Sequence, residues 1–279
     1  MKRIKSRKVR KRRIKIIVIF LMIICLGTLI ASAFEIYKWK IDSNKTNEQV
    51  NKVQEITKIE EVTNEDDVLV IPQEEEISKA NPYWDYIKMN LIHVDFQELT
   101  RVNQDTKGWI QVNGTNVNYP FVQVKNNDYY LNHSFDKSWN SAGWVYLDYR
   151  NNVNNLDKNT IIYAHGRYDN TMFGSLRKIL SNGWLKDKNN FVIKLSTEKE
   201  NTLWQVFSVY RIPTTSDYLQ VEFYDNQEFL DFTDMLIKRS GYDFKTSVYE
   251  NDMILTLSTC YDDYDKLVVH AKMIKKESR

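Results

Sequence analysis

The longest apolar stretch of the chain lies close to its N-terminus. The segment IIVIFLMIICLGTLIASAF, residues 16–34, runs for about 19 residues without a charge, roughly the length that crosses the hydrocarbon of a bilayer as a helix. This pattern predicts a transmembrane anchor at 16–34. A cleaved signal peptide is the alternative, because Ala31, Ser32 and Ala33 have the small side chains of a cleavage site. The length of the apolar run favours an uncleaved anchor.

From residue 108 onward, apolar and polar positions alternate in short segments, which predicts strands. The segment GWIQVNGTNVNYPFVQV (108–124) alternates on both sides of Asn113-Gly114, a pair typical of a hairpin turn. Further strands are predicted for GWVYLDY (143–149), NTIIYAH (159–165), FVIKLS (191–196), LWQVFSVYRI (203–212), MILTLST (253–259) and KLVVHAKMI (266–274). Many short strands with few helices between them favour a mainly β fold, a closed β-barrel.

Two short helices are expected before the barrel. The segment NPYWDYIKMNL (81–91) places three apolar side chains on one helical face, those of Trp84, Ile87 and Leu91. A second helix is predicted to start at Phe96, because Asp95 and Glu98 have the spacing of a capping box.

Two further helices are predicted to interrupt the barrel. The first is MFGSLRKIL (172–180). The second, NQEFLDFTDMLIKRSG (226–241), is long and lies before the penultimate strand. Its capping pair is Asp225 and Glu228, its last turn is basic, and Gly241 follows it.

Charge divides the chain into regions. Ten of the 39 Lys and Arg residues lie in segment 1–15, so the rest has 29 basic against 37 acidic residues, a formal charge of about −8. A nucleic-acid partner is therefore not expected. The positive-inside rule places 1–15 in the cytoplasm and the chain after the anchor outside the cell. Segment 35–79 is rich in Lys, Glu, Asn and Thr, which predicts a polar stalk beneath a domain at 80–279.

The chain has two cysteines, and only one of them lies outside the anchor. Because Cys25 belongs to the apolar segment, Cys260 has no partner for an intrachain disulfide. An unpaired extracellular cysteine indicates intermolecular pairing or a reactive thiol, whereas the alternative is a buried cysteine that packs as a small apolar residue.

A thiol nucleophile needs an imidazole that can exchange protons with the reacting groups. Of the four histidines, His165 comes at the end of a predicted strand and is followed by glycine. Packed or hydrogen-bonded roles are favoured for His93 and His133, and His270 lies inside the last strand. We therefore expect His165 and Cys260 to be the pair that could meet at a barrel rim.

At these residues the chain resembles the sortases, and within them class B. The resemblance lies in TLSTC (256–260), IIYAHG (161–166) followed by MFGSL, the segment 108–123, DYYLNHSF and a strand that ends in LDYRNN. It covers about residue 80 to the C-terminus, with the blocks in the order of that family. Sortases cut a sorting signal on a secreted protein through a thioester and join the new carboxyl end to an amine.

This resemblance implies a role for individual residues. Cys260 would be the nucleophile and His165 the general acid and base. Ser258, with Thr259 and Tyr261 beside the nucleophile, would contact the substrate. The family also has an Arg near the start of the strand after the Cys loop, and here that position is Lys266.

A lysine at this position can supply charge but not a planar two-pronged donor. Lys266 is therefore a candidate catalytic cation, with an ordinary solvated lysine as the alternative. Arg211, Arg167 or backbone N–H groups near Tyr261 are the other candidates for binding the oxyanion.

The resemblance also implies partners. They are secreted proteins with a C-terminal signal of the Asn-Pro-x-Thr type, a cell-wall precursor or pilin amine as acceptor, and the lipid bilayer at the anchor. No cofactor or metal is expected, because the acidic turn at 262–265 lacks the ligand spacing of a calcium loop. A pilin-polymerising enzyme and a non-catalytic binding module on the same barrel are the alternative functions.

Overall fold

The computed structural model describes residues 2–62, 68–70 and 82–279. The chain divides into two compact units, Met1–Lys45 and Thr46–Arg279.

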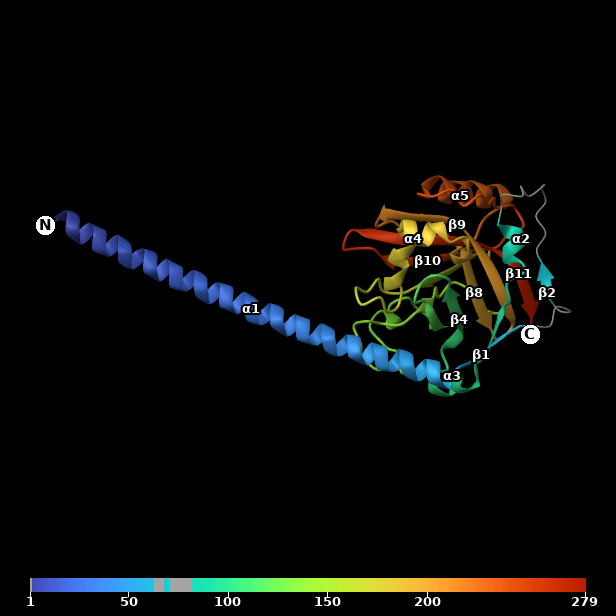
Figure 1. Cartoon of the computed structure of the whole chain (residues 1–279), viewed down its shortest axis with the longest axis horizontal. Coiled ribbons are helices and arrows are strands. Elements are labelled where there is room, and N and C mark those ends of the chain that lie inside the picture. Colours follow the sequence, from blue (N-terminus) through green and yellow to red (C-terminus); the bar gives the residue numbers. More distant parts are fainter. Residues whose placement is uncertain (1, 63–67, 71–81) are drawn as a thin grey trace. The chain divides into compact units, whose positions relative to one another are not determined.

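The first unit consists of helix α1 (Lys2–Ile56), which continues into the second unit (Figure 1). Residues 16–34 lie within α1, and all their side chains are exposed. So large an apolar surface is unfavourable in water and favourable in lipid. Among the described residues, α1 is the one helix with the length and composition to cross a membrane. These properties are consistent with the predicted anchor.

The second unit is built on a closed, mixed β-barrel, which confirms the predicted fold class. Its strand order is β10-β7-β6-β5-β4-β8-β9-β11, and an additional β10–β11 pairing closes the sheet. Pairs β10–β7 and β5–β6 are parallel, and the other barrel pairs are antiparallel. The strands are β4 (Thr106–Val112), β5 (Asn118–Val122), β6 (Tyr146–Leu147), β7 (Asn159–Tyr163), β8 (Val192–Thr197), β9 (Glu200–Pro213), β10 (Ile254–Cys260) and β11 (Asp265–Ser278).

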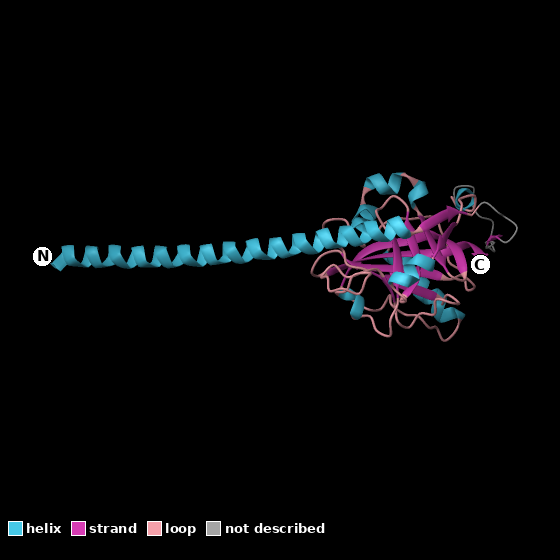
Figure 2. Cartoon of the chain, turned by 90° about the horizontal axis from the view of Figure 1, so that it is seen from below, coloured by secondary structure: helices cyan, strands magenta, loops and turns pink. Residues whose placement is uncertain are grey.

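Strands β9, β10 and β11 are buried on both faces. Their inward side chains, such as Trp204 and Leu257, join the main core inside the barrel. Their outward side chains, such as Phe207 and Val268, form a second core with helix α5 (Asn226–Arg239). Figure 1 shows α5 lying along β9 on the outside of the sheet, and Figure 2 shows the barrel after a 90° turn. This covering explains why these strands have nearly continuous apolar sequences.

The cap predicted for α5 is confirmed. The Asp225 carboxylate accepts a hydrogen bond from the Glu228 backbone N–H at 2.9 Å, and Glu228 accepts one from the Tyr224 N–H at 2.5 Å. The first bond satisfies a donor that the start of the helix leaves free, whereas the second holds the residue just before the N-cap. The C-terminal cap is Ser240, which has an extended backbone, so Gly241 does not end the helix in a left-handed conformation.

Other predicted elements are shorter or of another type. The predicted hairpin is present, but β4 and β5 are joined by five residues, 113–117, in which Gly114 has a φ of +70°. The predicted strand at 143–149 is reduced to β6. The predicted helix at 172–180 is a 3-10 helix, η2 (Gly174–Leu180), followed by the short helix α4 (Asn182–Lys186). A second 3-10 helix, η1, covers Tyr129–Leu131, and a third, η3, covers Lys188–Asn190.

The two helices expected before the barrel are both short. Helix α2 (Tyr83–Tyr86) buries its two tyrosines, whereas Trp84 is 52% exposed, so the predicted apolar face was wrong. Helix α3 (Gln97–Val102) begins one residue after the predicted start, and Asp95 accepts from the Gln97 N–H at 2.9 Å.

Part of the segment expected to form a stalk belongs to the folded domain. Strand β1 (Lys58–Glu61) pairs with β3 (Ile92–Asp95), and β2 (Val68–Val70) extends the barrel sheet on β11. The end of α1 also contacts the domain, because Gln49 donates to Asp136 at 2.8 Å. The compact unit therefore starts at Thr46, before the boundary expected at residue 80.

His270 is fully buried in β11 and has a partner at each ring nitrogen. Nε2 lies 2.9 Å from the Tyr210 hydroxyl, and Nδ1 lies 2.9 Å from the Thr256 hydroxyl, which itself donates to Asn159. Thr256 therefore accepts from Nδ1–H, and Nε2 accepts from Tyr210. Burial, followed by the charge of Arg239, lowers the pKa of His270 to about 3.

This buried histidine predicts a loss of stability in mild acid. Unfolded histidine has a pKa of about 6.5, so between that pH and about 3 the unfolded state binds the proton and the folded state does not. The free energy of unfolding is expected to fall by about 2 kcal/mol between neutral pH and pH 5 from this residue alone. Urea unfolding of the full chain in detergent at both pH values measures it. In His270→Gln the loss should be clearly smaller, and an equal loss in both proteins would contradict the prediction.

Candidate active site

Two neighbouring parallel strands bring the predicted nucleophile and base to the same edge of the barrel. In the β7–β10 pair, Tyr163 is opposite Ser258, so His165 and Cys260 each follow two residues later. The Thr259 hydroxyl donates to the Ala164 carbonyl oxygen at 2.7 Å and holds the two strand ends together. At Gly166, an added Cβ would lie 1.9 Å from the Cys260 carbonyl oxygen, so this close approach requires glycine.

Lys266 lies against the Cys260 thiol. Its Nζ is 3.1 Å from Sγ, and the two residues are directly opposite each other in the β10–β11 register. A four-residue loop, 261–264, joins the strands at this point. An ammonium at this distance can donate a hydrogen bond to a thiolate or to an oxyanion beside it.

The His165 ring is oriented by a backbone carbonyl. Nε2 lies 2.7 Å from the Leu131 carbonyl oxygen, at the end of the 3-10 helix η1. A carbonyl oxygen only accepts, so Nε2 carries the proton in this hydrogen bond. Nδ1 is then the nitrogen with a lone pair, and the half-buried ring can exchange a proton there.

The side chains expected to contact substrate have partners within the chain. Ser258 is 5% exposed, and its hydroxyl lies 3.0 Å from that of Tyr218. Thr259 is 3% exposed and bonds to Ala164, as described above. The Tyr261 N–H donates to the Asp265 carbonyl oxygen at 2.8 Å, so this amide, one of the expected oxyanion donors, is already engaged.

Both alternative arginines are held by carboxylates. Arg167 is buried and pairs with Asp169 at 2.8 Å. Arg211 pairs with Asp262 at 2.6 Å and also with Asp265. Of the three cationic side chains considered from the sequence, Lys266, Arg167 and Arg211, it is Lys266 that contacts the Cys260 sulfur.

A third arginine near the site was not identified from the sequence. Arg177 lies in η2, directly after the block MFGSL, and it donates to carbonyl oxygens next to both His165 and Cys260. Its position after that block was its sequence signal, because nothing in the spacing of the residues predicts which carbonyl oxygens meet a guanidinium.

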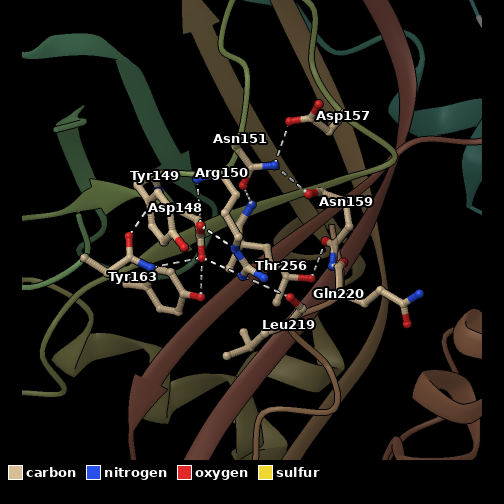
Figure 3. Close-up of polar contacts among 12 residues, drawn as sticks. Asp148, Tyr149, Arg150, Asn151, Asp157, Asn159, Tyr163, Leu219, Gln220 and Thr256 are labelled. Carbon is tan, nitrogen blue, oxygen red and sulfur yellow. Dashed lines mark hydrogen bonds and ion pairs between the residues drawn. The ribbon is translucent and has the colours of Figure 1, made fainter. Parts of the chain in front are cut away.

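A buried carboxylate supports the strand that leads to His165. The Asp148 side chain has no exposed surface and accepts hydrogen bonds from Arg150 and the Tyr163 hydroxyl (Figure 3). It also accepts one from the Asn127 side chain. Burial alone would raise the pKa of Asp148, but the hydrogen bonds from Arg150 hold it below its usual value. Arg150 also donates to the Leu219 carbonyl oxygen at 3.0 Å. The network thereby ties β7 to segment 215–223, which carries Tyr218.

The other histidines have contacts of their own. His133 stacks on Tyr129 at 4.0 Å between ring centroids, and His93 lies 2.9 Å from an Arg279 nitrogen. In the described part of the chain, no three His, Cys, Asp or Glu side chains are grouped as they would be around a metal ion.

Comparison with known proteins identifies the family. The family model described as "Sortase domain" matches residues 110–274, which include every site residue named above. Sortase B of Staphylococcus aureus (strain NCTC 8325 / PS 47) is 35% identical over 188 residues, 66% of this chain and 76% of that protein.

Solved structures show the same fold. A sortase B in complex with triglycine is 35% identical, with a TM-score of 0.61 over 64% of this chain and 85% of that chain. Sortase B from Bacillus anthracis is 30% identical, with a TM-score of 0.65 over 86% of this chain and 99% of that chain.

Proposed function

Because the chain belongs to the sortase family and is a cysteine transpeptidase of the sortase B type, we propose that it cuts a C-terminal signal of the Asn-Pro-x-Thr type on secreted proteins. The new carboxyl end is then joined to an amine of the cell wall. One observation carries the proposal. The ends of parallel strands β7 and β10 place His165 and Cys260 at one edge, with Lys266 Nζ 3.1 Å from the thiol sulfur.

In the first half-reaction, the Cys260 thiol passes its proton to Nδ1 of His165, and the sulfur attacks the carbonyl carbon of the substrate threonine as a thiolate. The carbonyl oxygen becomes an oxyanion, which the Lys266 ammonium stabilises. The C–N bond then breaks, and His165 delivers a proton to the departing nitrogen. The products are a thioester on Cys260 and the released C-terminal peptide.

In the second half-reaction, an acceptor amine attacks the thioester carbon. His165 takes a proton from the amine, a new amide bond forms, and the Cys260 sulfur leaves. One amide bond is exchanged for another, so no oxidant, reductant or cofactor enters the balance.

The residues beside the nucleophile are proposed to receive the substrate. We assign the half-buried Tyr261 to the surface against which the signal lies, whereas Ser258 and Tyr218 are buried and support the end of β10 from behind through their shared hydrogen bond. Thr259 contributes indirectly, because its hydroxyl bonds to Ala164 and thereby holds Cys260 near the end of β7.

The acceptor and the orientation in the membrane are also proposals. The sortase B structure in complex with triglycine supports a glycine amine as the acceptor. The ten basic residues before the apolar segment support a cytoplasmic N-terminus and a domain outside the cell.

A ligation assay tests the proposal. The full chain in detergent is incubated with a labelled Asn-Pro-x-Thr peptide and triglycine, and the products are analysed by mass spectrometry. We expect the peptide to be cut after Thr and joined to triglycine, with a hydroxylamine-sensitive adduct on the enzyme. A peptide with the same residues in scrambled order is the control. If the two peptides react equally, the proposed signal is wrong.

A further inference from the structure

Arg177 joins the two loops that follow the proposed base and nucleophile. Its Nη2 donates to the Gly166 carbonyl oxygen at 2.7 Å and to the Tyr261 carbonyl oxygen at 2.8 Å. Nε also reaches Tyr261 at 3.2 Å, and Nη1 donates to the Arg167 carbonyl oxygen at 3.1 Å. Gly166 directly follows His165, and Tyr261 directly follows Cys260. One guanidinium therefore bonds to the residue next to each reacting group.

Aromatic rings lie beside this guanidinium. The Arg177 Cζ lies 4.8 Å from the ring centroid of Tyr168 and 5.8 Å from that of Tyr261. The Tyr261 ring also meets Arg211 at 4.2 Å, and Arg211 is held by Asp262 and by a further carboxylate of the same loop. A guanidinium close to an aromatic ring is attracted to it, which favours the arrangement in which its donors meet the three carbonyl oxygens.

We propose that Arg177 is a positioning residue for transpeptidation. It keeps the His165 imidazole and the Cys260 thiol at the relative positions that proton transfer requires. This rests on the proposed function of the two residues. A guanidinium has five N–H donors in one plane and can bond to three carbonyl oxygens, whereas an ammonium has a single nitrogen. Misplacing a reacting group by about 1 Å can cost about 100-fold in rate.

Other contacts hold the same backbone, so the fold does not depend on Arg177 alone. Thr259 bonds to the Ala164 carbonyl oxygen, Gly166 forms a bridge with Met172, and the Phe173 N–H donates to the His165 carbonyl oxygen at 3.1 Å. We therefore expect a loss of Arg177 to alter the relative placement of the two loops without unfolding the domain.

The test compares Arg177→Gln and Arg177→Lys with Lys178→Gln in the full chain in detergent. Lys178 is the matched control, because it is the next residue of η2, loses the same charge in the variant, and has an exposed side chain whose ammonium donates to Asn116 at 3.2 Å. For each protein, kcat and KM for transfer of the labelled peptide to triglycine are measured at a temperature where circular dichroism shows full folding.

For Arg177→Gln we expect kcat to fall about 100-fold, with KM within about twofold of the parent value. Arg177→Lys should recover part of the loss, and Lys178→Gln should match the parent. If Arg177→Gln does not fold, the kcat of Arg177→Lys tests the proposal instead. We expect this kcat to fall by at least about threefold, because lysine lacks the donors that bridge the carbonyl oxygens. The proposal would be overturned by an unchanged kcat, whether KM stays the same or rises. A parent protein that forms no thioester would instead refute the proposed function.

Discussion

Cys260→Ala is expected to abolish peptide transfer, and His165→Ala to lower it by about 10²–10⁴-fold. The first change removes the sulfur that would form the thioester. The second removes the imidazole that the Leu131 carbonyl orients at the same edge of the barrel. The measurement is the rate of peptide transfer to triglycine, together with the mass of the enzyme after incubation with labelled peptide.

The matched control for these variants is His93→Gln. His93 lies in β3, and in the described part of the chain its ring nitrogens meet Arg279 and Asn201. We expect this variant to transfer peptide at the parent rate. Label bound covalently to the Cys260→Ala protein would show that another residue is the nucleophile, and parent activity in His165→Ala would remove the imidazole from the mechanism.

Lys266→Ala is expected to lower kcat/KM by about 10²-fold, the scale of losing one oxyanion donor. Its Nζ lies 3.1 Å from the sulfur, so the charge is close to the position where an oxyanion forms on the attacked carbonyl. The free energy of unfolding should change by less than about 0.5 kcal/mol, because Lys266 is only half-buried at a strand end. Transfer kinetics and urea unfolding of the same preparations separate the two effects.

Lys266→Arg is the sharper variant at this position. The register places residue 266 directly opposite Cys260, so an arginine would begin from the same backbone position. Its planar donors should support transfer at least as well as lysine does. If Lys266→Ala keeps the parent rate, the cation for the oxyanion is not Lys266, and the lysine is an ordinary charged residue at the end of a strand.

The sequence alone determined the features that depend on local pattern. Helix α5 was predictable because Asp225 caps it and its apolar residues repeat with the helical period. The long strands were predictable because they alternate or are continuously apolar. Cys260 and His165 could be named because each ends such a strand, and because the surrounding blocks resemble those of a family in which the two residues react.

Tertiary structure decided what depends on a partner distant in the chain. Strand β1 has mainly exposed polar side chains, so backbone pairing with β3 makes it a strand. The predicted helix at 81–91 contains one helical turn, Tyr83–Tyr86, and packing of the chain places Tyr83 and Tyr86, and not Trp84, against the core.

The contacts at the candidate active site were also decided by tertiary structure. The contact between Lys266 and Cys260 follows from the β10–β11 register, and the three carbonyl oxygens that meet Arg177 come from two separate loops. A sequence pattern shows how apolar and polar positions repeat within one helix or strand. The register between elements, and the carbonyl groups left to accept hydrogen bonds, arise only when those elements pack together.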